Sequence, residues 1–201
     1  MFNLDALFKT ALALFVIMDP FASLPIFTIL TRRYNDAKKL QAAVSATTIA
    51  AVTLVVFVLI GPSLMDMIGI SMPAFTITGG ILLLLTAIIT FLGIETGDKL
   101  THKDVDVKIV VVAVPLITGP GTMTTAVILA GQYGLLTTLI AIVIVIAAIF
   151  IVLSLSKQIS KFAGKKGIAV MSKLFSILLA AIAIEFLKNG IAEVITEWGL
   201  I

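Results

Sequence analysis

The stretch Asp19-Pro20-Phe21-Ala22-Ser23-Leu24-Pro25 interrupts an otherwise apolar segment that runs from Leu4 to Leu30. A second apolar segment, Lys108 to Leu129, is interrupted in the same way by Pro115-Leu116-Ile117-Thr118-Gly119-Pro120-Gly121. Both segments are as long as the roughly 20 residues that a helix needs to cross the hydrocarbon core of a membrane. Because proline lacks an N–H donor and clashes with the carbonyl one turn earlier, we predict that each segment is a membrane helix broken near the midplane.

The composition favours a membrane protein over a soluble domain. Of the 201 residues, 60% are hydrophobic and only 12% are charged, whereas soluble domains carry roughly a quarter charged residues. A globule of this size could not hide so much apolar surface from water. The sequence therefore predicts an all-α integral membrane protein with six transmembrane helices, of which the first and fourth are broken. The four unbroken spans are predicted at Gln41 to Ile60, Ala74 to Leu92, Leu135 to Leu155 and Ile168 to Leu187.

The basic residues are confined to alternate connections. All but two of the 14 lysines and arginines fall between or beside the first and second, the third and fourth, or the fifth and sixth predicted helices. The two exceptions are Lys9 and Lys188. Because cytoplasmic loops carry the excess of positive charge, we predict a multi-pass topology with both termini outside the cytoplasm. The basic balance thus has a topological explanation, and we expect no nucleic-acid partner.

The two breaks also divide the chain into matching halves. Pro20 and Pro120 correspond at an offset of 100 residues, and Phe75 corresponds to Phe175 at the same offset. Each half contains three predicted helices, an odd number, so the second half must enter the membrane in the opposite direction. The prediction is one membrane domain made of two inverted repeats, residues 1–97 and residues 98–201.

A helix can be broken inside lipid only where the freed backbone groups face a cavity, a substrate or an ion. The half-helix after each break presents N–H groups and a positive dipole end, which suit a carboxylate. The freed carbonyls suit an ammonium group, and the glycines let a ligand approach the backbone. The alternative is a proline kink that binds nothing. The predicted substrate-binding residues at the breaks are Asp19, Pro20, Phe21, Ser23, Thr118, Gly119, Pro120, Gly121 and Thr122.

Two acidic residues lie within predicted spans and are candidates for ion coupling, because a carboxylate inside a membrane is costly and usually faces a cavity or a partner. Asp19 could coordinate Na⁺, relay a proton or meet an ammonium group, or it could cap the half-helix that begins after it. Glu185 precedes Lys188 by three positions, so a local ion pair is its alternative.

Further residues bear on possible sites. Gly79 and Gly80 form a small-residue patch that suits either close helix packing or contact with substrate, and Gly79 joins the substrate-binding candidates. The chain has no cysteine, and its single histidine, His102, lies in a charged loop without a ligand partner nearby. We therefore predict no metal site and no cofactor other than a coupling Na⁺ or H⁺.

Three ordered motifs resemble those of the MarC family, the small neutral amino acid transporter (SnatA-type) family. They are Asp19-Pro20 with Leu24-Pro25-Ile26-Phe27, Pro73-Ala74-Phe75 leading to Gly79-Gly80, and Pro115-Leu116 followed by Gly119-Pro120-Gly121-Thr122. The resemblance covers nearly the whole chain. It implies a six-helix transporter of glycine, alanine and similar amino acids in a prokaryotic plasma membrane. Family members commonly carry Asn where this chain has Asp19, and a carboxylate can titrate whereas an amide cannot.

The leading hypothesis is a secondary active transporter of small neutral amino acids that works by alternating access, driven by an H⁺ or Na⁺ gradient. A passive channel or an exporter of small polar solutes is the alternative, although no repeated ring of charges or carbonyls suggests a filter. We do not expect an enzyme, since Asp19 and Glu185 lack the context of a paired aspartyl catalyst. The expected partners are the amino acid and membrane lipid, and the sequence leaves open the coupling ion, the transport direction and any oligomer.

Overall fold

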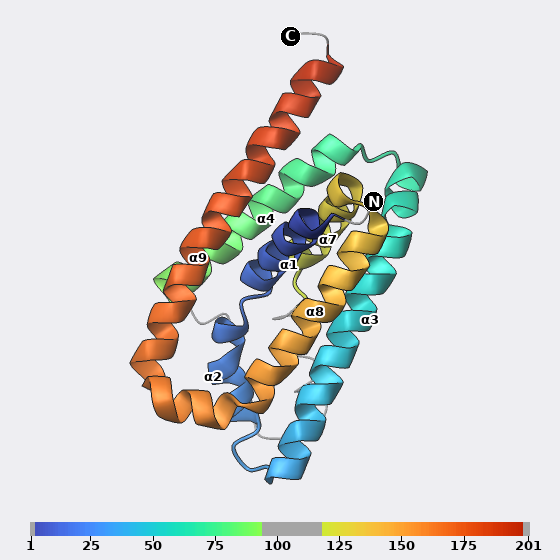
Figure 1. Cartoon of the computed structure of the whole chain (residues 1–201). Coiled ribbons are helices and arrows are strands. Elements are labelled where there is room, and N and C mark those ends of the chain that lie inside the picture. The colour runs from blue at the N-terminus through green and yellow to red at the C-terminus, as the bar shows by residue number, and fades with distance from the viewer. Residues whose placement is uncertain (1–2, 94–117, 199–201) are drawn as a thin grey trace.

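The computed structural model describes residues 3–93 and 118–198, and every regular element within these two ranges is an α-helix (Figure 1). The helices are α1 (Leu4–Met18), α2 (Pro20–Leu30), α3 (Asp36–Ile68), α4 (Met72–Leu92), α7 (Pro120–Tyr133), α8 (Leu135–Ser154) and α9 (Ser156–Glu197). Helix α9 is kinked at Gly164, whose backbone is not helical (φ 63°, ψ 173°).

Four of these helices are long and apolar enough to cross a membrane: α3, α4, α8 and the part of α9 from Lys166 to Glu197. Helices α1 and α2 together form a fifth candidate, bent by 44° at the break between them. The all-helical membrane architecture is thereby confirmed, with four or five candidate spans in the described residues. The predicted fourth span begins outside those residues, and α7 is its described part, so the count of six stays a prediction.

The structure corrects the predicted boundaries of two spans. The sequence predicts a span from Gln41 to Ile60, but α3 begins at Asp36 and continues through Pro62 to Ile68. The Asn35 side chain accepts a hydrogen bond from the Lys38 N–H at 2.8 Å and so caps the earlier start. Hydropathy marks only the part of a helix that lies in lipid, and for the same reason α9 extends well beyond the predicted Ile168 to Leu187.

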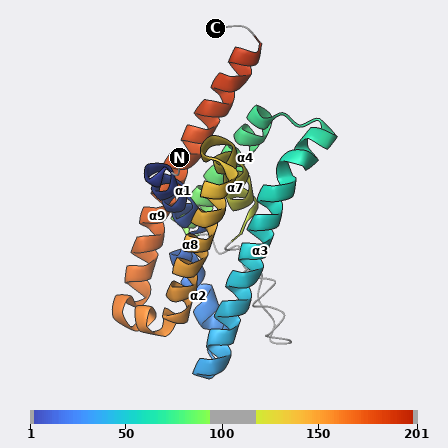
Figure 2. The same cartoon turned by 45° about the vertical axis from the view of Figure 1, so that its right-hand side comes forward.

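The helices pack as two outer pairs with α1 and α7 between them (Figures 1 and 2). Helices α3 and α8 form one pair, and their facing residues dominate the larger buried cluster. Alanines of α3 meet branched residues of α8 there, which lets the two helices approach closely. The main members are Ala42, Ala43, Ala46 and Ala50 of α3 and Ile142, Val145 and Ile149 of α8.

Helices α4 and α9 form the other pair and run antiparallel to each other. The start of α4 lies beside Gly190 of α9, where an added Cβ would stand only 2.7 Å from Cγ1 of Ile77. Further along, a Cβ on Gly80 would stand 2.8 Å from Cγ of Leu187. At the end of α4, the Lys173 ammonium lies 5.7 Å from the centre of the Phe91 ring. Glycine is therefore required at two points of this interface, because any side chain would push the helices apart.

Candidate functional site

The first helix break is built by the residues at its centre. Helix α1 ends at Met18, and α2 begins at Pro20, whose missing N–H costs nothing at the first position of a helix. Between them, Asp19 adopts a left-handed conformation (φ 33°, ψ 74°), and it is the only non-glycine residue with a positive φ among the described residues. Its Oδ1 atom accepts a hydrogen bond from the Ala22 N–H at 3.1 Å. Aspartate tolerates this backbone better than most residues and also caps the new helix.

The carboxylate of Asp19 is buried, with 8% of the residue exposed. Its second oxygen, Oδ2, faces α9, where the Ser172 hydroxyl donates to it over a long 3.5 Å. Within the described residues, no lysine or arginine forms an ion pair with it. The capping role considered from the sequence is thus present, through Oδ1 and the Ala22 N–H. The Oδ2 atom accepts the long contact from Ser172.

Aromatic rings adjoin the same break. Phe21, in the first turn of α2, lies edge-on to Phe175 of α9 with ring centres 5.0 Å apart. Phe15 of α1 meets the same ring at 5.9 Å. Phe21 is among the predicted site residues, but Ser172, Phe15 and Phe175 are not. The sequence marks Phe175 only as the repeat partner of Phe75, and an isolated serine in an apolar helix gives no signal of what it faces.

The second break differs from the first in how its helix begins. Helix α7 starts at Pro120 after Gly119, which provides no side-chain cap. The Gly119 carbonyl accepts from the N–H groups of Thr122 and Met123 at 2.9 and 3.1 Å. Among the other predicted residues, Thr118, Gly121 and Thr122 are buried and Pro120 is exposed. The earlier part of this break, including Pro115, lies outside the described residues, as does His102.

Neighbouring side chains fill the space beside the glycines near the second break. An added Cβ on Gly121 would stand 2.6 Å from Cδ2 of Leu83 on α4. On Gly79 of α4 it would collide with the methyl group of Thr124 on α7. Gly79 therefore serves the close packing considered from the sequence, and Leu83 fills the space beside Gly121 that we expected a ligand to approach.

The hydroxyls at the two breaks donate to their own helices. Ser23 donates to the Asp19 carbonyl at 3.4 Å, while Thr124 and Thr125 donate to the carbonyls of Pro120 and Gly121 at 2.7 and 2.8 Å. These bonds go to carbonyls at the broken ends of the helices, and the hydroxyl oxygens keep lone pairs that can still accept.

The two breaks flank the same part of α4. Ile17, two residues before Asp19, belongs to one buried cluster with Leu83, and Leu83 is the residue that covers Gly121. From the breaks the half-helices run in opposite directions. Helix α2 leads to the start of α3 and α7 to the start of α8, at opposite ends of the bundle (Figures 1 and 2).

Glu185, the second ion-coupling candidate, forms a local ion pair. Its carboxylate lies 2.6 Å from the Lys188 ammonium, and both side chains are more than half exposed. This is the i,i+3 pair that the sequence offered as the alternative. Asp19 is therefore the one acidic residue of the described chain that is buried.

Comparison with known proteins gives a consistent family match. The sequence model of a family described as "MarC family integral membrane protein" matches residues 4–195. A protein named UPF0056 membrane protein from Archaeoglobus fulgidus is 32% identical, covering 98% of this chain and 97% of its own length. A protein of the same name from Aquifex aeolicus is 31% identical, covering 93% and 92%. One from Buchnera aphidicola is 26% identical over 94% of this chain and 97% of its own length. No solved structure matches.

Proposed function

The chain belongs to the MarC family of integral membrane proteins, and from that premise we propose that it is a secondary active transporter of small neutral amino acids such as glycine and alanine. In this proposal six membrane spans form two inverted repeats in a prokaryotic plasma membrane, and an H⁺ or Na⁺ gradient drives alternating access. The observation that carries the proposal is the pair of half-helices that begin at Pro20 and Pro120. They start beside the same part of α4 and run to opposite ends of the bundle, which is how transporters build a midplane site.

The chemistry of the two breaks suits a zwitterion. The start of α7 has no side-chain cap, so its positive dipole end can attract a substrate carboxylate. At the start of α2 the corresponding place is taken by Asp19 itself. Its buried negative charge favours a cation, either the ammonium group of the substrate or the coupling ion.

The close packing at the second break favours a small substrate over a bulky one. Leu83 and Thr124 pack directly against Gly121 and Gly79, so a bulky side chain would have to displace them. The side chains of the amino acids glycine and alanine are no larger than a methyl group. Their ammonium and carboxylate groups are the parts that the two breaks are suited to bind.

The proposal is tested with the full-length chain in liposomes loaded with unlabelled alanine. We expect saturable uptake of labelled alanine, and we expect an imposed Na⁺ or pH gradient, each applied separately, to drive accumulation. Asp66→Asn, which neutralises an exposed acid near the end of α3, is the control and should transport normally. Uptake that neither saturates nor exchanges would support the passive channel instead, and no uptake of any small neutral amino acid would refute the proposal.

A further inference from the structure

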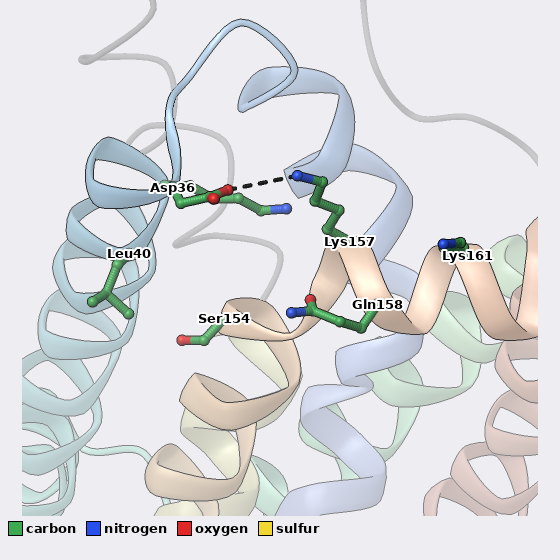
Figure 3. A pocket seen from close by; sticks show the side chains of 7 residues that line it. Asp36, Leu40, Ser154, Lys157, Gln158 and Lys161 are labelled. Carbon is green, nitrogen blue, oxygen red and sulfur yellow. Dashed lines mark ion pairs between the residues drawn. The ribbon is translucent and has the colours of Figure 1, made fainter.

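A pocket of about 480 Å³ lies where the start of α3 meets the junction of α8 and α9 (Figure 3). It is remote from the helix breaks and has no part in the proposed transport site. Most of the residues that line it have polar side chains, and several of these are hydrogen-bond donors. The lining residues are Asp36, Lys39, Leu40, Ser154, Lys157, Gln158 and Lys161.

The pocket carries a net positive charge. Three lysines and one aspartate line it. The ion pair drawn in Figure 3 joins Lys157 Nζ to Asp36 Oδ1 and is long, at 3.7 Å. Lys39 and Lys161 form no ion pair with any residue that the structure describes. An anion would therefore be favoured there.

Helix dipoles add to this charge. Helices α3 and α9 both begin at the pocket, so two positive dipole ends lie beside it. Helix α8 ends beside it, and its negative dipole end offsets one of the two positive ends. The net dipole charge at the pocket is therefore that of one helix N-terminus. The dipoles therefore reinforce the attraction for an anion that the lysines provide.

We expect the pocket to lie at the depth of the lipid headgroups. Helix α3 has 33 residues and is about 50 Å long, which exceeds the hydrocarbon thickness of about 30 Å. Its first turns, which line the pocket, therefore stand outside the hydrocarbon core at the end of the bundle that is rich in lysine and arginine. This is the end that the charge distribution predicts to be cytoplasmic.

Exposed apolar residues lie on both helices, α3 and α8, near the pocket. Leu40 lines the pocket itself, and it is 49% exposed. Val44 follows one turn later on α3, while Ile151 and Leu155 are exposed near the end of the adjacent α8. A ligand that combines a negative headgroup with acyl chains would satisfy both surfaces at once.

We infer that this pocket binds the phosphate group of an anionic phospholipid, with the acyl chains along the exposed apolar residues of α3 and α8. Lys157 and Lys161 would donate to the phosphate oxygens, and the hydroxyl of Ser154, which has no hydrogen-bond partner among the described residues, belongs to a residue that lines the same pocket. Basic pockets between membrane helices bind anionic headgroups on the cytoplasmic side by this chemistry.

The test measures lipid binding to the purified full-length chain by native mass spectrometry. We expect the wild-type chain to bind phosphatidylglycerol at least about tenfold more tightly than phosphatidylcholine with the same acyl chains, since several lysines beside an anionic headgroup give a preference of this order. The double variant Lys157→Gln/Lys161→Gln should lose this preference. The matched control, Lys38→Gln/Lys166→Gln, removes two exposed lysines from the same end of the molecule that do not line the pocket, and it should keep the preference.

A second variant tests the effect of the pocket's shape on lipid binding separately from the effect of its charge. Gln158 is exposed, so Gln158→Trp should fold, fill the pocket and reduce phosphatidylglycerol binding, whereas Gln158→Ala should not. Inorganic phosphate at millimolar concentration provides the remaining arm. Competition by phosphate would support recognition of the phosphate group itself. An equal loss in both double variants, or unchanged binding in Gln158→Trp, would overturn the inference, because the lipid would then respond only to general surface charge.

Discussion

The hydroxyl of Ser172 on α9 lies 3.5 Å from Oδ2 of Asp19, a residue 153 positions earlier in the chain. It joins the first helix break to α9, the longest helix in the described part of the chain. This contact is the direct route by which we expect a change in the charge of Asp19 to be felt by α9.

Asp19→Asn separates the backbone role of this residue from its charge. Asparagine also tolerates the left-handed conformation and also caps helices, so we expect the melting temperature to change little. Accumulation driven by the ion gradient should be lost, while exchange of labelled for unlabelled alanine continues. Asp19→Ala removes the cap as well, and we expect it to destabilise the fold by about 1–3 kcal/mol. Gradient-driven accumulation that survives in Asp19→Asn would exclude Asp19 as the coupling group.

Ser172→Ala removes the hydroxyl that faces Asp19 from α9. Because a hydrogen bond of 3.5 Å to a charged group is weak, we expect a loss of about 1 kcal/mol or less, seen as an uptake rate reduced up to about fivefold. Ser172→Thr keeps the hydroxyl and should restore uptake. Ser176→Ala is the matched control, since this neighbouring buried hydroxyl donates to the Lys173 carbonyl and not to the break. Equal effects in both alanine variants would mean that Ser172 acts through packing alone.

Gly121→Ala tests the contact between α7 and α4. The added methyl group would meet Leu83 at 2.6 Å, and overpacking of this kind costs about 1–3 kcal/mol. The double variant Gly121→Ala/Leu83→Ala should recover part of this loss, so that the two effects do not add. Thermal unfolding in detergent measures all of them. Gly131→Ala, on the same helix with nothing within 4 Å, should be neutral or slightly stabilising.

The predicted orientation can be tested with single cysteines, because the chain has none. Phe162, at the lysine-rich end, is 99% exposed, and Met67, at the opposite end of α3, is 83% exposed. We expect a membrane-impermeant maleimide to label Met67→Cys in intact cells and Phe162→Cys only after the membrane is opened. The reverse pattern would place both termini in the cytoplasm.

The position of the first break could be predicted to the residue, since Pro20 permits a helix to start and aspartate both tolerates the left-handed backbone and caps the next helix. These are local effects, and local effects can be inferred from neighbouring residues. The predicted end of α3 is wrong for the opposite reason. Gly61-Pro62 resembles a connection, but α3 continues through both residues, and Gly61 packs against Val127 of α7.

The partners of the break could not be predicted in the same way. Ser172 and Phe175 reach the break only because α9 folds back beside α1 and α2, and nothing in their own neighbourhood specifies that placement. Similarly, glycine at position 121 suggests room for a ligand because the sequence does not show that Leu83 lies against it. The residue types of the site were predictable, while their contacts depend on tertiary structure.

The close contact of α4 with α9 bears on which parts can move. In the proposed repeats α4 belongs to the first half and α9 to the second, and the same division separates α3 from α8. Gly80 and Gly190 interlock α4 with α9, and the alanines of α3 hold α8. A rocking motion of one half against the other would have to disrupt both the α4–α9 and the α3–α8 interface. For the proposed alternating-access cycle we therefore expect the rigid bodies to be the mixed pairs α3–α8 and α4–α9, with hinges at Asp19 and Gly119, where the helices are already broken.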